Sequence, residues 1–252
     1  MKLSNLRHSK DWCRVLCYPK CDKVRFKELI NYLRDYGVNE LISYGKVRIG
    51  NINIIGKGHS SVIILGRHDD YGLVAIKIRR VDSKVGSLIL ECKLMNLGYP
   101  VTPKTYFCSD DLIIREFIVG MELSGLINHL SNCSEATLLI LSILASAFWL
   151  DLVGIDHKEL SRPDKHIIVT NKLTARIIDL ESASLRRGCN VCRVLSWLLI
   201  RRKLLSRFCF NAEDIESKIN SLLRQYKRGS SKYFIDICRV ISEYMVKFGN
   251  LY

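Results

Sequence analysis

The sequence predicts an α+β protein in which a five-stranded antiparallel sheet with one inserted helix is followed by a mainly helical half. Residues 47–78 contain three β-rich runs joined by short turns, which is the pattern of an antiparallel meander. Beyond Gly120 the chain changes to longer stretches in which apolar residues recur at helical spacing. The length of 252 residues, with 48% hydrophobic residues, suits one large domain or two packed lobes.

Residues 1–45 are predicted to form a helical extension that precedes the main fold. Four apolar residues recur at the i, i+3, i+4, i+7 spacing of one helical face: Phe26, Leu29, Ile30 and Leu33. Gly37 is a natural stop for this helix. A helix-turn-helix that reads DNA is a weaker interpretation, because no second helix of suitable length is evident before Gly45.

Residues 46–119 are predicted to form the first lobe. Its five strands are rich in β-branched residues and span Val47–Ile55, Ser61–Leu65, Leu73–Ile78, Thr105–Cys108 and Leu112–Val119. One helix, Ser83–Leu97, is inserted before the last two strands, and Leu90, Leu94 and Leu97 share a face of it.

Residues 120–252 are predicted to form a second, mainly helical lobe. The expected helices are Glu122–Leu130, Glu135–Leu152, Asn190–Leu205, Ala212–Tyr226 and Tyr233–Phe248. Two short strands, Ile167–Thr170 and Ala175–Ile178, are expected to pair through a turn at Asn171-Lys172.

The charge and the hydropathy of the chain bear on its partners. A net charge of +14 favours polyanionic partners such as nucleotides, RNA or anionic surfaces, although a solvated basic surface gives the same balance. No signal peptide is evident, and the most apolar run, Leu138–Leu150, is shorter than the roughly 20 residues of a membrane span. We therefore expect a buried helix there, no membrane association and a cytoplasmic protein.

The ten cysteines include Cys189 and Cys192 in a C-x-x-C pattern and the group Cys13, Cys17 and Cys21. A four-thiolate zinc site usually combines two C-x-x-C-like units, and only one unit has that spacing here. Reduced, partly buried thiols are therefore favoured over a metal site. Disulfides become the expectation if the source is a hyperthermophile.

Two patterns in the first lobe concern phosphate binding. Gly56-Lys57-Gly58 lies in a turn between antiparallel strands, so it is not a dinucleotide-binding fingerprint, which requires a following helix. Glycines in such a turn let the backbone approach phosphates without side-chain clash. Val74-Ala75-Ile76-Lys77 lies on a later strand, and its apolar neighbours make Lys77 unusual for an exposed strand lysine.

These patterns resemble the G-x-G-x-x-G-x-V and V-A-I-K segments of protein kinases, with Ser61 at the third glycine. The resemblance implies that Lys77 binds the α- and β-phosphates of ATP and pairs with Glu91 of the following helix. It also implies that the segment around Glu116 and Ile118 binds adenine through backbone groups. The remaining residues that it places around ATP are Gly56, Lys57, Gly58, Ser61, Ile63 and Ala75.

Two later segments resemble the catalytic motifs of the same family. His157-Lys158-Glu159-Leu160 is similar to H-R-D-L, which makes Glu159 the candidate base, and Ile178-Asp179-Leu180 is similar to D-F-G, which makes Asp179 a Mg²⁺ ligand. Asp164 lies five residues after Glu159, where the family places a metal-binding Asn, whereas His166 directly precedes the next strand. Because Mg²⁺ prefers oxygen to imidazole, Asp164 is the predicted second ligand and His166 the alternative.

No A-P-E motif follows Asp179, so the chain resembles minimal atypical kinases of the RIO type and the predicted archaeal serine/threonine protein kinases. This resemblance implies a bilobal protein-kinase-like fold, ATP with Mg²⁺ or Mn²⁺, and transfer of the γ-phosphoryl group to a protein hydroxyl; a small-molecule kinase stays open. The alternative is a nucleotide-binding ATPase or pseudokinase-like factor associated with RNA or ribosomes. Its phosphate contacts would come from Arg186-Arg187, Arg201-Arg202-Lys203 and Lys227-Arg228.

Overall fold

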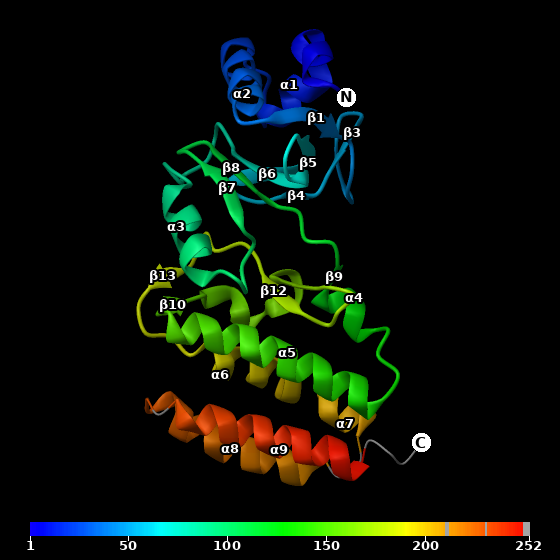
Figure 1. The fold of residues 1–252 in the computed structure, drawn as a ribbon, viewed down its shortest axis with the longest axis vertical. Helices are drawn as coiled ribbons and strands as arrows, with labels where there is room; N and C mark the ends of the chain where they lie inside the picture. The colour runs from blue at the N-terminus through cyan, green and yellow to red at the C-terminus, as the bar shows by residue number, and fades with distance from the viewer. Residues whose placement is uncertain (210–211, 230, 249–252) are drawn as a thin grey trace. The chain divides into compact units, whose positions relative to one another are not determined.

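The structure, a computed structural model, describes residues 1–209, 212–229 and 231–248 and confirms an α+β protein with antiparallel sheets. The chain divides into two compact units (Figure 1). The first unit comprises Met1–Asn96 with Pro103–Phe117, and the second comprises Leu97–Thr102 with Ile118–Tyr252. Each unit is described below by itself.

The first unit begins with a 3₁₀ helix, Leu3–His8, and two helices, α1 (Lys10–Leu16) and α2 (Lys23–Asp35). The Asp22 carboxylate caps α2, since it accepts hydrogen bonds from the backbone of Val24 and Arg25. The predicted apolar face of α2 is confirmed, because its four apolar residues are all buried: Phe26, Leu29, Ile30 and Leu33.

The main sheet of the first unit has six strands rather than the predicted five. Along the sheet the order is β1-β5-β6-β8-β7, and β4 pairs with the other end of β5. All pairings are antiparallel. The strands are β1 (Val38–Ile42), β4 (Gly56–Lys57), β5 (Ser61–His68), β6 (Gly72–Arg79), β7 (Thr105–Cys108) and β8 (Leu112–Glu116).

Three corrections explain the difference in strand number, and one of them is that Gly56–Lys57, predicted within a turn, forms β4 and pairs with β5. Residues 47–55, predicted as one strand, form a separate hairpin of β2 (Val47–Ile49) and β3 (Ile52–Ile54), because Gly50 takes a positive φ and turns the chain. Residues 38–42, predicted within the helical extension, are the edge strand β1 instead. The burial of Val38 and Leu41 in one core with α1, α2 and the sheet holds β1 there.

The helix of the first unit, α3 (Ile89–Gly98), begins six residues later than predicted. Ser83 and Ser87 bond to nearby backbone groups, and the Ser87 hydroxyl accepts the hydrogen bond of the Ile89 backbone N–H. The predicted apolar face is wrong in part, since Leu94 is buried but Leu90 and Leu97 are exposed. The other buried side chains of α3 are Glu91, Cys92 and Met95.

The second unit is mainly helical, as predicted, with three small antiparallel sheet pairings. β9 (Met121–Glu122) and β12 (Ala175–Ile177) flank β11 (Ile167–Val169), and β10 (Ile155–Asp156) pairs with β13 (Ser184–Leu185). The helices are α4 (Leu123–Ile127), α5 (Cys133–Leu152), α6 (Asn190–Leu195), α7 (Leu204–Phe208), α8 (Ala212–Lys227) and α9 (Lys232–Phe248).

Two predicted helices of this unit are interrupted. The helix predicted over 122–130 is shortened at both ends, since β9 takes Glu122 and α4 ends at Ile127. The helix predicted over 190–205 changes to a π-helical segment, Ser196–Arg201, and is broken at Lys203, whose φ is positive.

Helix α5 contacts α6, α7 and α9, and the ribbon shows it alongside the other helices of this unit (Figure 1). Among the described residues, α5 is the one helix that is long and apolar enough to cross a membrane. However, 56% of its most apolar 18-residue stretch is buried inside the protein. This burial is consistent with a soluble protein, in which α5 is a core helix.

The structure pairs eight of the ten cysteines, so the prediction of reduced thiols is wrong. The disulfides are Cys13–Cys21, Cys92–Cys108, Cys133–Cys209 and Cys189–Cys192. Cys17 and Cys238 are free. The sequence could not show these pairs, because three of the four join cysteines that lie eight or more positions apart.

Candidate functional site

Lys77 and Glu91 form an ion pair inside the first unit. Lys77 lies on β6 between β5 and β8, opposite Ile63 and Ile113. Its Nζ donates to both Glu91 carboxylate oxygens at 2.8 and 2.7 Å, and the side chains are only 2% and 5% exposed. The neighbouring Cys92 is bonded to Cys108 of β7, so a disulfide holds this part of α3 to the sheet. The structure thus brings together the two residues that the sequence predicted to pair.

The glycine-rich turn joins β4 to β5. Gly58 N–H donates to the Ser61 carbonyl oxygen, and Arg80 donates to the Gly58 carbonyl oxygen. A Cβ atom at Gly56 or Gly58 would meet other atoms only at 3.8 Å or more, and neither glycine has a positive φ. The fold itself therefore does not require glycine at either position.

The other residues predicted around ATP differ in how far their side chains are exposed. Ser61 and Ala75 are buried, whereas Ile63 is half-buried. Lys57 is exposed, and its ammonium group lies 5.3 Å from the centre of the Tyr18 ring. Ser61 and Ala75 therefore have little side-chain surface to offer a ligand.

The predicted adenine-binding segment lies where the chain passes from one unit to the other. Glu116 ends β8, and its carboxylate accepts a hydrogen bond from Lys104 N–H at 3.1 Å. Ile118 is 6% exposed and is the first residue of the second unit's main segment. The Glu116 side chain therefore has a structural partner within the protein.

In the second unit, His157 organises the segment that carries Glu159. Its ring lies fully buried, and Nε2 is 3.3 Å from the Ile178 carbonyl oxygen, next to Asp179. Burial lowers the pKa of His157, and the Ile178 carbonyl acts in the opposite direction. This contact ties the H-K-E-L segment to the Asp179 segment.

Three polar side chains meet beside this contact: Glu159, His166 and Asp179. Their ligand atoms all lie within 4.8 Å of one another. Glu159 also accepts a hydrogen bond from the Ser182 hydroxyl at 2.9 Å. Asp179 has a positive φ of 63°, a backbone conformation that an Asp tolerates better than most residues.

Asp164, the predicted second metal ligand, is not among these three residues. It lies half-buried in the 3₁₀ turn Pro163–Lys165. His166 follows that turn directly, and its Nδ1 lies 3.9 Å from Glu159 Oε2. The structure therefore favours the alternative, His166, as the neighbour of Asp179.

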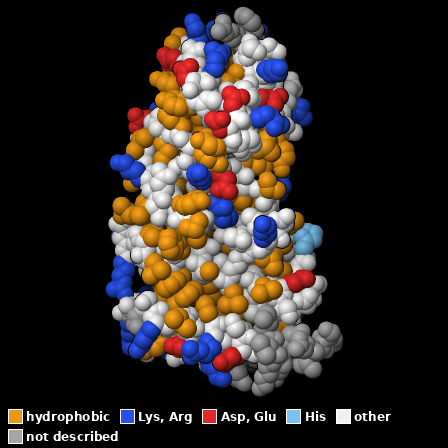
Figure 2. All heavy atoms as spheres, in the orientation of Figure 1, with side chains coloured by type: hydrophobic (Ala, Val, Ile, Leu, Met, Phe, Trp, Pro, Cys, Tyr) orange, Lys and Arg blue, Asp and Glu red, His pale blue; other side chains and the backbone are white. Residues whose placement is uncertain are grey.

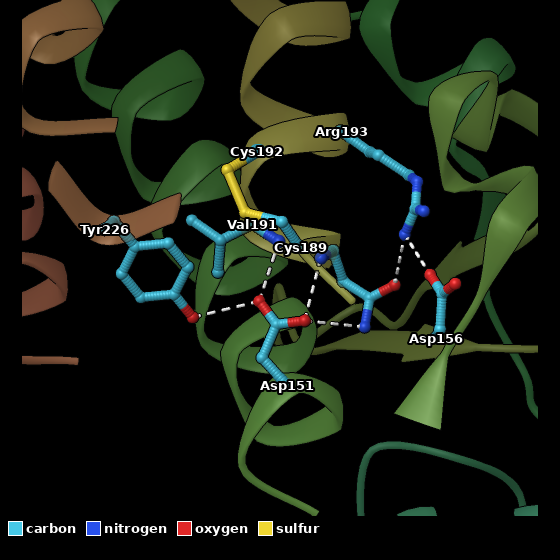
Figure 3. Close-up of a disulfide and its surroundings, with 8 residues drawn as sticks. Asp151, Asp156, Cys189, Val191, Cys192, Arg193 and Tyr226 are labelled. Carbon is cyan, nitrogen blue, oxygen red and sulfur yellow. Dashed lines mark hydrogen bonds and ion pairs between the residues drawn. A yellow bond between two sulfur atoms is a disulfide. The ribbon is translucent and has the colours of Figure 1, made fainter. Parts of the chain in front are cut away.

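A buried network in the same unit was not predicted from the sequence. Asp151, near the end of α5, accepts hydrogen bonds from Tyr226 and from the backbone of Asn190 and Val191 (Figure 3). Burial raises the pKa of Asp151, and these hydrogen bonds partly offset it. The sequence offered one indication of this network, since Asp151 directly follows the most apolar run of the chain, Leu138–Leu150.

Asp156 is the second acid of this network and is 1% exposed. It forms ion pairs with Arg186 and Arg193. Burial would raise its pKa, but the hydrogen bonds from the two guanidinium groups outweigh that effect and lower the pKa of Asp156. Arg186, considered above as a phosphate contact, therefore has an acidic partner within the protein.

The predicted basic surface for RNA is not gathered on the face drawn in Figure 2. Lys and Arg side chains are interspersed there with hydrophobic and acidic ones. Arg202 is also engaged, with its guanidinium carbon 4.8 Å from the centre of the Trp197 ring. RNA contact therefore stays a prediction from the net charge alone.

Replacing Asp156 with Asn is expected to destabilise the protein by about 2–3 kcal/mol at neutral pH, because one guanidinium group would face an amide in place of a carboxylate. Because the pKa of Asp156 is lowered in the folded protein, its contribution to the free energy of unfolding is fully present above about pH 3.8. This contribution is lost as the pH falls further and the carboxylate is protonated. The variant should therefore lose less stability on acidification than the wild type, as measured by urea unfolding at several pH values. Asp236→Asn is the matched control, since Asp236 pairs with Arg239 at the surface. Parallel pH curves for Asp156→Asn and the wild type would contradict this prediction.

No model of a protein family matches the chain, and no curated protein matches it.

Proposed function

We propose that the chain is an ATP-dependent phosphotransferase with a bilobal protein-kinase-like fold, which moves the γ-phosphoryl group to a protein hydroxyl. The observation that carries this proposal is the buried Lys77–Glu91 pair. A buried ion pair often stabilises a protein no more than apolar residues of similar volume. Apart from Lys77, all residues of β6 from Val74 to Ile78 are buried and apolar. A functional role of Lys77 therefore explains the buried pair better than a contribution to the stability of the fold does.

The glycine-rich turn supports the same proposal. Gly56 and Gly58 are not demanded by backbone conformation or by close neighbours. Their absent side chains are explained if the turn backbone approaches the phosphates of ATP. In this proposal Lys77 binds the α- and β-phosphates, and Glu91 orients its ammonium group.

The second unit offers residues that fit a divalent cation. His166 Nδ1 is buried and has no hydrogen-bond partner in the part of the chain that the structure describes. The His166 nitrogen and a carboxylate oxygen of Asp179 form a mixed ligand set. Such a set suits Mn²⁺ better than Mg²⁺, because Mg²⁺ prefers oxygen ligands. We assign the metal to Asp179 and His166, where it would neutralise phosphate charge, and we assign Glu159 as the base for the acceptor hydroxyl. With ATP as co-substrate, a cytoplasmic location is part of the same proposal, and the four disulfides then imply a hyperthermophilic source, whose intracellular proteins keep disulfides.

The test is to incubate the protein with labelled ATP and either Mg²⁺ or Mn²⁺, with and without a generic protein acceptor. We expect label on the acceptor or on the protein itself, with Mn²⁺ at least as effective as Mg²⁺. Release of phosphate without transfer would favour the nucleotide-binding ATPase instead. If the protein binds no ATP in a titration, both functions are excluded.

A further inference from the structure

Both cysteines of the Cys189–Cys192 disulfide are partly exposed, whereas Cys92, Cys133 and Cys209 of two other disulfides are buried. The Cys13–Cys21 disulfide joins a buried cysteine to an exposed one. The Cys189–Cys192 disulfide also closes the shortest loop, with a sequence separation of 3, so it restrains the unfolded chain least. Reagents in solution can therefore reach this pair, and the fold depends on it least.

A cavity of about 300 Å³ opens beside this disulfide in the second unit. Cys189 lines the cavity, whereas Cys192 is not among its lining residues. The volume lies at the lower end of the range of small-molecule sites. Of the two cysteines, only Cys189 therefore borders the space that a small molecule would occupy.

The charges of the cavity favour an anion. Arg187 and Lys227 line it, and both are exposed. Its one lining acid, Asp151, accepts hydrogen bonds from Tyr226 and from the backbone of Asn190 and Val191 (Figure 3). The cavity lining therefore carries two cationic groups and one carboxylate, and that carboxylate already accepts several hydrogen bonds from the protein.

We propose that Cys189–Cys192 is a thiol–disulfide exchange site for a small anionic thiol, which enters this cavity and attacks Cys189. The thiolate forms a bond to Cys189 Sγ, the bond between the two cysteines breaks, and Cys192 leaves as a thiolate that takes up a proton. A second thiol molecule attacks the mixed disulfide, releases Cys189 and leaves as a small-molecule disulfide. Two small thiols are oxidised and one protein disulfide is reduced; the reverse reaction with the small-molecule disulfide closes the pair again.

The pair is linked to the His157 segment through Asn190, which lies between the two cysteines and is fully buried. The Asn190 side chain accepts the hydrogen bond of His157 N–H at 3.0 Å and donates to the Ile155 carbonyl oxygen at 2.6 Å. Opening the disulfide removes a covalent restraint on Asn190. We therefore expect the amide of His157 to exchange its hydrogen faster in the reduced protein.

The decisive test compares Cys192→Ser with Cys189→Ser in the full-length protein, each incubated with oxidised glutathione and without nucleotide. Each variant leaves one thiol of the pair free, and mass mapping locates the mixed disulfide. We expect Cys192→Ser to form it on Cys189 about tenfold faster than Cys189→Ser forms it on Cys192, since only Cys189 lines the cavity. Equal rates, or a faster reaction at Cys192, would overturn the proposal.

A second measurement uses the wild-type protein, so it does not depend on the folding of a variant. Graded reduction by glutathione, followed by alkylation and mass mapping, should label Cys189 and Cys192 before the cysteines of Cys92–Cys108 and Cys133–Cys209, which contain buried sulfurs. Hydrogen exchange at the His157 amide is read in the same samples. Reduction of either of those two disulfides before this pair, or of all four disulfides together, would refute the assignment.

The anionic character of the thiol is tested with Arg187→Gln combined with Lys227→Gln. This double variant should react with glutathione up to about tenfold more slowly, while its rate with 2-mercaptoethanol, whose attacking thiolate carries no further charge, falls much less. An equal loss with both thiols would show that the two cations do not select an anion. Because no ATP is present in any of these experiments, their outcome is independent of the proposed phosphotransferase activity.

Discussion

Replacing Lys77 with Met is expected to destabilise the protein by about 3–5 kcal/mol, the usual effect of removing one partner of a buried ion pair. The variant leaves the Glu91 carboxylate, which is 5% exposed, without the ammonium group that now donates to both of its oxygens. If the proposed function is correct, Lys77→Met also abolishes the phosphate contact and weakens ATP binding strongly.

A double-mutant cycle separates these two effects. Glu91→Leu alone leaves Lys77 buried without its carboxylate, whereas Lys77→Met combined with Glu91→Leu removes both charges. Urea unfolding should show the double variant to be more stable than either single variant, because an apolar pair can replace a buried ion pair with little loss. Lys57→Met, an exposed lysine of the same sheet, should change the stability by less than about 0.5 kcal/mol. If the losses of the two single variants simply add in the double variant, the pair does not stabilise the fold as a unit. ATP binding is expected to be lost even in the double variant, since it still lacks Lys77.

Replacing Glu159 with Gln is expected to slow phosphoryl transfer by about 10²–10⁴-fold while leaving nucleotide affinity nearly unchanged, because Gln cannot accept a proton. Asp179→Asn should instead weaken metal-ATP binding and slow transfer together. Asn is suited to the positive φ at position 179, so this change removes the charge without straining the backbone. The measurements are nucleotide titration and single-turnover phosphorylation for both variants.

Two further variants decide which residue completes the proposed metal site. His166→Gln should weaken Mn²⁺ binding, followed by the electron paramagnetic resonance signal of the free ion, since His166 lies in the cluster with Asp179. Asp164→Asn is the matched control and should bind Mn²⁺ like the wild type. The opposite ranking would return the role to Asp164, as the sequence predicted. If Glu159→Gln transfers at the wild-type rate, Glu159 is a structural acid held by Ser182.

The sequence determined those features that depend on neighbouring residues. The apolar face of α2 and the ends of α8 and α9, within one residue, follow from helical periodicity, which is a local property. The pairing of β11 with β12 follows from two apolar runs and a short turn. The Lys77–Glu91 pair was also accessible, since the resemblance to the V-A-I-K motif implies a glutamate partner on the following helix and Glu91 is the acid of that helix.

Only the tertiary structure decided which distant segments meet. Residues 38–42 have no clear alternation, and they form a strand because β5 offers an edge and the core buries Val38 and Leu41. Cys133 and Cys209 are 76 positions apart, a separation at which no spacing rule specifies a partner. His166 lies beside Asp179, and Asp164 does not, because a 3₁₀ turn places them differently. Asp151 and Tyr226 likewise form a hydrogen bond across 75 positions. Such contacts depend on the three-dimensional packing of whole elements, and the sequence carries no local signal for them.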